Sequence, residues 1–319
     1  MNTDKNLNTP YDDVFRTMLV NCPELIIPVV NEVFGKDYSN EKIVLCQNEV
    51  YVNGYGEDGE KRITDSHFTI GKDKYHIECQ STPDGSMIIR MFEYDIRIAL
   101  QDANADKERI EINIPNSAVL YLRSTKNTPS EYTITINVPG EKSCSYTVPV
   151  LKVKEYGIDE IFTKELYFLI PFHIFTYENK FKVYEQDEDK LKELKNTYVG
   201  IFDRLRDLME QEKLTEFEKV IINEMSNTVA KYIAAKFDRL KKGLGDVMGG
   251  KVLETEAKNI RDAGIREGRN EGRNEGLREG IERTVLYYRQ IGETDENIAK
   301  LISNIYGITT EEAKNAFLI

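Results

Sequence analysis

The stretch RITDSHFTIGKDKYHIECQS, residues 62–81, alternates apolar and polar side chains on both sides of the short polar segment GKDK. Alternation with a period of two is typical of a β-strand with one buried face. A glycine-containing polar segment between two such runs predicts a hairpin. Together with the β-branched and aromatic residues of 42–53, the stretch predicts a three-stranded antiparallel meander.

The expected register of this hairpin decides which side chains share a face. A turn centred on Lys72 and Asp73 pairs Ile70 with Tyr75 and His67 with Glu78. The period of two then separates a polar face from an apolar face. The expected polar face consists of Asp65, His67, His76, Glu78 and Gln80. The expected apolar face consists of Thr64, Ser66, Phe68, Ile70, Tyr75, Ile77 and Cys79.

Helical patterns flank the meander. Apolar residues recur at helical spacing over 11–34 and again over 84–102, directly after the third strand. Further strands are expected at 117–123, 131–138 and 144–152. This order predicts an α/β (α+β) protein, in which helices flank a mixed sheet.

The chain is expected to contain four parts. Residues 1–158 form the core, and the helical region 159–255 packs on it or extends it. Glycines recur every four residues from Gly264 to Gly280, and each costs a helix roughly 1 kcal/mol relative to alanine. The segment 256–283 is therefore either a charged helix or a linker. Residues 284–319 form a small helical C-terminal segment.

Composition excludes several classes of protein. The 319 residues include 43 basic and 55 acidic side chains, for a net charge of −12, which argues against a protein that coats nucleic acid through many phosphate contacts. Four cysteines without CxxC spacing indicate neither a disulfide framework nor a zinc knuckle. The longest apolar run, 166–175, is short and contains Pro171, so we expect a cytoplasmic protein without a membrane span.

The expected polar face is a candidate metal site. In the expected register Asp65 and Glu78 are diagonal neighbours, close enough for their carboxylates to share a divalent cation. Oxygen ligands suit Mg²⁺ or Mn²⁺, which activates water for phosphodiester hydrolysis. Gln80 would hold the attacking water or a phosphate oxygen, and His67 would tune the site. The alternative is a polar sheet face without a metal.

The helix predicted over 84–102 supplies cations beside that face. Arg90 and Tyr94 are four residues apart, and Arg97 lies one turn further along the same side. Together they form a candidate phosphate clamp. The alternative is that both arginines are solvated or paired with Glu93 and Asp95.

Several strings of the sequence resemble a known family. They are TPYDDVFRTML (9–19), RITDSHFTI (62–70), YHIECQS (75–81), IRMFEYDIRIAL (89–100) and the repeat REGRNEGRNEG in the helical half. The chain thereby resembles the PD-(D/E)XK nuclease-family transposases, also described as Rpn recombination-promoting nucleases. The resemblance implies a restriction-endonuclease-like core and Mg²⁺-dependent DNA cleavage, linked to recombination or a mobile element.

The resemblance also assigns roles to individual positions. Asp65 matches the first carboxylate of the motif, Glu78 the second, and Gln80 the place of the usual lysine. An acid on the first helix often joins such sites, and Asp13 is the candidate, with Glu49 on the first strand as an alternative.

The glutamine at position 80 changes the expected chemistry. A lysine would stabilise phosphate charge, whereas glutamine only donates and accepts hydrogen bonds, so the metal and Arg90 would carry more of that charge. We expect a metal-dependent endonuclease whose partner is DNA. A homo-oligomer formed through the C-terminal helical half is a further candidate. The alternative is a catalytically degenerate DNA-binding or assembly protein on the same fold.

Overall fold

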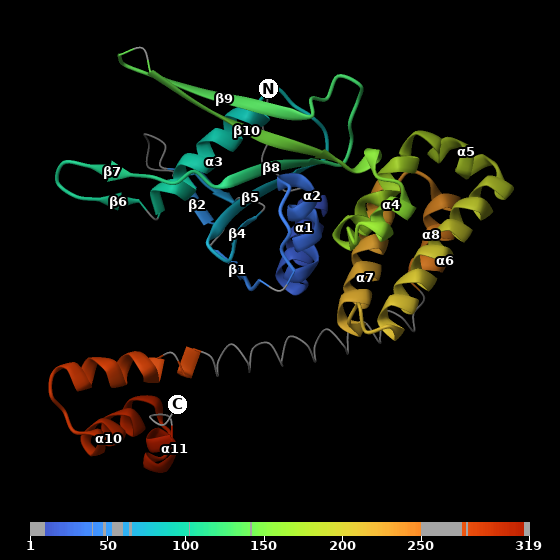
Figure 1. Cartoon of the computed structure of the whole chain (residues 1–319). Coiled ribbons are helices and arrows are strands. Elements are labelled where there is room, and N and C mark those ends of the chain that lie inside the picture. Colours follow the sequence, from blue (N-terminus) through green and yellow to red (C-terminus); the bar gives the residue numbers. More distant parts are fainter. Residues whose placement is uncertain are drawn as a thin grey trace. The chain divides into compact units, whose positions relative to one another are not determined.

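The computed structural model describes residues 10–39, 41–46, 49–52, 60–63, 66–101, 103–140, 142–249, 276–278 and 280–315 (Figure 1). The side chains of 49–52, 60–63, 310, 312 and 315 are not among those described. The chain divides into two compact units, Met1–Ala257 and Lys258–Ile319.

The first unit is organised around a six-stranded mixed sheet. The strand order is β1 (Ile43–Leu45), β4 (His67–Ile70), β5 (Asp73–Gln80), β8 (Asn116–Tyr121), β10 (Lys142–Lys152) and β9 (Glu131–Val138). Strand β8 runs parallel to both β5 and β10, and the other neighbours are antiparallel. The expectation of an α/β protein with a mixed sheet among helices is confirmed.

Helices cover the two faces of this sheet unequally. Helix α1 (Pro10–Asn21), the 3₁₀ turn η1 (Pro23–Ile26) and α2 (Ile27–Phe34) pack on one face. Helix α3 (Met87–Gln101) packs on the other face and connects the parallel strands β5 and β8, as a crossover helix does (Figure 1).

The register of the β4–β5 hairpin differs from the expected one. His67 lies opposite His76 and Phe68 opposite Tyr75, so the expected pairing of His67 with Glu78 is wrong. The turn consists of Gly71 and Lys72, because Gly71 adopts the left-handed backbone conformation (φ +58°) that glycine tolerates best. The turn therefore comes earlier than expected.

The error in register leaves the assignment of faces intact. A shift of two residues returns each side chain to the same face, because side chains alternate with a period of two. The expected apolar face is confirmed where it is described, and its members are buried: Ser66, Phe68, Ile70, Tyr75, Ile77 and Cys79. Thr64 lies outside the described residues.

The first part of the meander is more divided than expected. Two strands, β1 and β2 (Glu49–Val52), lie where the sequence predicts one over 42–53, and β2 pairs with β3 (Glu60–Ile63) in a separate hairpin. A second small hairpin, β6 (Asn104–Ala105) with β7 (Ile110–Glu111), was not expected, because strands this short carry no periodicity.

Helices dominate after β10 ends at residue 152, slightly before the expected boundary at residue 158. The elements are η2 (Val153–Glu155), α4 (Ile158–Thr163), η3 (Tyr167–Lys180), α5 (Phe181–Gln186), α6 (Glu188–Glu210), α7 (Glu216–Ile233) and α8 (Asp238–Met248). Their buried residues belong to the same core as those of α1 and α2, and the rings of Tyr11 and Phe175 lie 5.0 Å apart. This half is therefore continuous with the core.

One expected helix is broken in two. The pattern over 216–240 predicts one helix, but the structure ends α7 at Ile233 and begins α8 at Asp238. The Glu185 carboxylate of α5 accepts hydrogen bonds from the backbone N–H groups of Arg239 and Leu240, at 3.1 and 3.0 Å. This long-range cap stabilises the start of α8.

The second unit is a small helical cluster. It contains a helix over 280–290, α10 (Asp295–Tyr306) and α11 (Thr310–Asn315), packed around residues that include Ile281, Ile298 and Ile302. Gly264, Gly268 and Gly272 of the glycine repeat lie outside the described residues.

Among the described residues, no single helix has the length and apolar composition needed to cross a membrane, and α1 with the segment Pro23–Phe34 passes that test only as a pair bent by 114°.

Ser66 replaces part of the strand ladder with its side chain. Its buried hydroxyl donates to the Ile77 carbonyl (2.7 Å) and accepts from the Ile77 N–H (2.9 Å). We expect Ser66→Ala to lower the free energy of unfolding by about 1–3 kcal/mol, because both backbone groups lose their buried partner. Urea denaturation measures this loss. The control is Ser145→Ala, which removes an exposed hydroxyl and should change stability by less than about 0.5 kcal/mol. Equal losses in the two variants would contradict the assignment.

Candidate functional site

The polar face of β5 lies beneath α3. His76, Glu78 and Gln80 alternate with the buried apolar residues of the strand and point to the face that α3 covers. The His76 side chain is fully buried and that of Glu78 is 10% exposed. Charged groups at this depth require partners, because burial strongly disfavours an unpaired charge.

Two carboxylates hold His76 from opposite sides. Its Nε2 lies 3.0 Å from Oε1 of Glu78, and its Nδ1 lies 2.9 Å from Oδ1 of Asp95 on α3. Ionised carboxylates only accept hydrogen bonds, so both ring nitrogens donate and the ring carries a positive charge. Burial by itself lowers the pKa of His76, but the bonds to Asp95 and Glu78 raise it by more, to about 9.

Further donors complete the hydrogen bonds of Asp95. The Ser117 hydroxyl on β8 donates to Oδ1 at 2.5 Å, and the Tyr146 hydroxyl on β10 donates to Oδ2 at 2.9 Å. Burial, followed by the charge of Asp95, raises the pKa of Tyr146, so its hydroxyl keeps the proton it donates. The network therefore ties α3 to three neighbouring strands.

The sequence interpretation misplaced Asp95. The sequence offers Asp95 as a partner of the arginines on α3, but its side chain is fully buried and binds His76. Its place on the predicted helix, beside Tyr94 on the side with Met91 and Ile98, was an available signal, because those positions form the buried stripe of α3.

Gln80 and Arg90 meet at the end of β5. An Arg90 Nη2 group donates to Oε1 of Gln80 (3.2 Å) and to Oδ2 of Asp84 (3.1 Å). Burial raises the pKa of Asp84, but hydrogen bonds from Ser86 and the charge of Arg90 lower it by more, so its pKa falls below the usual value. Arg90 is thus held beside Gln80 with 30% of its side chain exposed.

A second arginine lies where β5 and β8 end. The Arg123 guanidinium binds Glu178 through two nitrogens, each at 2.7 Å, and lies 4.7 Å from the centroid of the Phe175 ring. The backbone N–H of Arg123 donates to the backbone carbonyl of Ser81. The Arg123 guanidinium lies 5.8 Å from the centroid of the Tyr11 ring. The first turn of α1 therefore reaches the strand end that carries Gln80.

The other candidate residues are divided between the two faces of the sheet. Tyr94 is buried with its ring edge-on to His76 at 5.8 Å between centroids, and Arg97 is half-buried on α3. His67 is buried on β4 directly opposite His76. The carboxylate of Asp13 is 67% exposed and lies 3.8 Å from Arg16, on the helix that covers the other face of the sheet.

Two candidate metal ligands lie partly or wholly outside the described residues. Asp65 is one of them, and of Glu49 only the backbone in β2 is described. Within the described part of the chain, no group of three or more His, Cys, Asp or Glu side chains is arranged to hold a metal ion.

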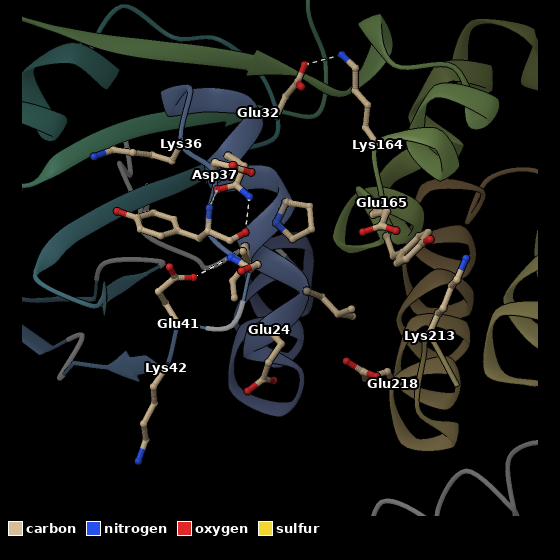
Figure 2. A pocket seen from close by; sticks show the side chains of 17 residues that line it. Glu24, Glu32, Lys36, Asp37, Glu41, Lys42, Lys164, Glu165, Lys213 and Glu218 are labelled. Carbon is tan, nitrogen blue, oxygen red and sulfur yellow. Dashed lines mark hydrogen bonds and ion pairs between the residues drawn. The ribbon is translucent and has the colours of Figure 1, made fainter. Parts of the chain in front are cut away.

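A large groove lies away from this polar face. Its volume is about 930 Å³. Figure 2 shows its lining side chains, which come from η1, α2, residues 36–39 and 41–42, residues 164, 165 and 167, Lys213, and Glu218 of α7. Its walls carry charges of both signs, including an ion pair between Glu32 and Lys164 at 2.7 Å. This mixture does not select a ligand by charge, so the polar face beneath α3 remains the better candidate site.

Comparison with known proteins adds no assignment. No family model matches the chain, and neither the curated proteins nor the solved structures contain a match. The site geometry therefore carries the functional argument.

Histidine titration tests the charge of His76. We expect its ring to remain protonated at neutral pH and to titrate near pH 9, because two carboxylates accept its protons. In Asp95→Asn the pKa should fall toward the ordinary value of 6.5. Nitrogen-15 NMR of the imidazoles measures both. His173 is the internal control, because burial lowers its pKa to about 4. A His76 ring that is neutral at pH 7 would contradict the network.

The same shift makes stability depend on pH. The pKa of His76 is higher in the folded state than in the unfolded state, so protonation favours folding. This contribution is complete below about pH 6.5 and is lost as the pH rises through about 9. We expect the stability advantage of the wild type over Asp95→Asn to narrow between about pH 6 and pH 9.5 in urea denaturation. A constant difference would contradict the linkage.

Proposed function

We propose that this protein is a Mg²⁺-dependent DNA endonuclease that hydrolyses phosphodiester bonds on a restriction-endonuclease-like core. The observation that carries the proposal is the arrangement of Glu78, Gln80 and Arg90. The first two occupy matched motif positions on one face of β5, and Arg90 is hydrogen-bonded to Gln80. The order of α1, the β1–β4–β5 meander, α3 and the parallel strand β8 agrees with what the family resemblance implies.

The oxygen donors of this face suit a hard cation. Mg²⁺ takes one or two carboxylates and completes its shell with water and phosphate oxygens, and Mn²⁺ accepts similar ligands. Glu78 offers one carboxylate, and we assign the second to Asp65. Asp65 immediately precedes Ser66 in the sequence, and the Ser66 hydroxyl binds the backbone of Ile77, the residue before Glu78. A bound ion would polarise the scissile phosphoryl group and activate water.

The surrounding residues position these groups. His76 donates to one oxygen of Glu78 and is itself held by Asp95, so the carboxylate is oriented before DNA arrives. The Gln80 amide donates to the carbonyl of Thr82 (3.2 Å) and accepts from Arg90. Gln80 therefore acts chiefly by placing the partly exposed guanidinium of Arg90 where it can neutralise a phosphate.

A second candidate function follows from the depth of Glu78. Its side chain is 10% exposed and already paired with a buried imidazolium, and position 80 lacks the charge of a lysine. Such a network is complete without a metal. The alternative is therefore a catalytically degenerate protein that binds DNA or takes part in assembly without cleaving.

Plasmid cleavage distinguishes the two functions. With supercoiled plasmid and MgCl₂ we expect the wild type to nick DNA, and Asp65→Asn or Glu78→Gln to slow nicking by roughly 100-fold or more, because transition-state charge loses its stabilisation. Glu193→Gln is the control, since Glu193 is exposed on α6 and pairs with Lys190. Gel electrophoresis measures the rates.

Each outcome of this assay decides between the candidates. Nicking that EDTA abolishes and that falls in both acidic variants supports the endonuclease. Binding of the plasmid without metal-dependent nicking supports the degenerate alternative. Equal nicking by the wild type and Glu78→Gln overturns the proposed site.

A further inference from the structure

Strand β9 forms one edge of the six-stranded sheet (Figure 1). It spans eight residues, whereas β1 at the opposite edge spans three. In the part of the chain that the structure describes, β10 is the strand that pairs with β9, and no strand pairs with its outer side. A long unpaired edge offers a row of backbone donors and acceptors to another strand.

The register identifies the outward backbone groups. The Val150 N–H donates to the Ser130 carbonyl at 2.9 Å, in line with the pairing of Val148 with Tyr132. Hydrogen-bonded pairs alternate along an antiparallel ladder, so the even-numbered residues of β9 bond to β10. The odd-numbered residues direct their N–H and C=O groups away from the sheet. They are Glu131, Thr133, Thr135 and Asn137.

The β9 edge lacks the sequence features that usually prevent an edge strand from pairing with another chain. The sequence of β9, EYTITINV, contains no proline and no lysine, and its one charge, Glu131, stands at the first position. Its threonines and isoleucines favour the extended conformation. The side chains of Thr133, Thr135 and Asn137 are exposed on the face opposite α3. Side chains stand roughly perpendicular to the sheet, so these three do not cover the outward backbone groups.

The face of β9 that points toward α3 is packed in a buried cluster. Ile134 is buried against the cluster that includes Met87 and Met91 of α3, and the Tyr132 hydroxyl lies 2.8 Å from that of Tyr121. The strand is therefore already in the conformation that pairing needs. Association with it costs less conformational entropy than ordering a mobile segment.

We propose that β9 pairs in antiparallel fashion with β9 of a second copy of this chain. When Thr133 lies opposite Thr135 of the other copy, Glu131 lies opposite Asn137, and every outward-facing residue of β9 is matched. No two like charges face each other in this register. The strand is thus complementary to itself, as a two-fold symmetric interface requires. This self-complementarity favours a second copy over an unrelated strand.

The pairing has a geometric consequence for the assembly. Directly opposed residues of antiparallel strands present their side chains on the same face of the sheet. The two six-stranded sheets would therefore join into one, with α3 of both copies on the same face. The two polar faces beneath α3 would then open to the same side.

A proline substitution tests the interface. Thr135→Pro removes an outward N–H group and spares the backbone hydrogen bonds to β10, which the even-numbered residues make. Thr135→Pro and Thr135→Val both remove the Thr135 hydroxyl, which lies 2.9 Å from that of Ser145 on β10. We expect the dimer of the full-length wild type to have a dissociation constant in the micromolar range. The dissociation constant of the proline variant should be about tenfold higher or more. Thr135→Val is the control, because it keeps the N–H group. Sedimentation velocity measures the dissociation constants.

Amide exchange shows whether β9 itself forms the contact. In the dimer, the amides of Thr133, Thr135 and Asn137 should be protected, and dilution should release them while Ile134 and Ile136 stay protected. Hydrogen exchange measured by NMR reports each amide and also shows whether Thr135→Pro retains the β9–β10 ladder. A wild type that is monomeric at all concentrations would overturn the proposal. A dimer with unprotected outward amides, or one that Thr135→Pro leaves unchanged with the ladder intact, would also overturn it.

Discussion

The buried contact of His76 with Asp95 and Glu78 is the constraint on which the polar half of this structure depends. A positive ring between two carboxylates, with Ser117 and Tyr146 completing the hydrogen bonds of Asp95, joins α3 to β5, β8 and β10. Removing one member of such a group leaves a buried charge without its partner, which is strongly destabilising. The position of α3 and the orientation of Glu78 therefore depend on the same few hydrogen bonds.

The sheet separates this network from the main apolar core. On one face, α1, α2 and the helical half bury aromatic and aliphatic side chains against β4, β5 and β8. On the other face, α3 shelters charged groups at the end of β5 and packs methionines against β9 and β10 further along. The apolar face supplies most of the hydrophobic stabilisation. Because the apolar face supplies this stabilisation, the polar face can carry ionisable groups, whose burial is otherwise unfavourable.

The meander shows which structural features can be predicted from the periodicity of the sequence. It identified the buried face through Phe68, Ile70, Tyr75, Ile77 and Cys79 even though the expected register was shifted by two residues. The shift arose because the left-handed conformation of Gly71 places the turn earlier than its polar neighbours suggest. Alternation reports a face reliably, whereas register also depends on turn geometry. The break between α7 and α8 escaped prediction for a related reason, since its stabilising carboxylate comes from Glu185 in α5.

The sequence by itself determined the succession of the main helices and strands, the apolar face of the β4–β5 hairpin and the side of β5 that carries Glu78 and Gln80, because these follow from local periodicity. Only the tertiary structure decided that His76 lies between Glu78 and Asp95, that Tyr146 reaches Asp95 from β10 and that Arg123 binds Glu178. It also placed β9 at the sheet edge. Each of these contacts joins elements that are distant in the chain, so it depends on the strand order and helix packing that local patterns do not encode.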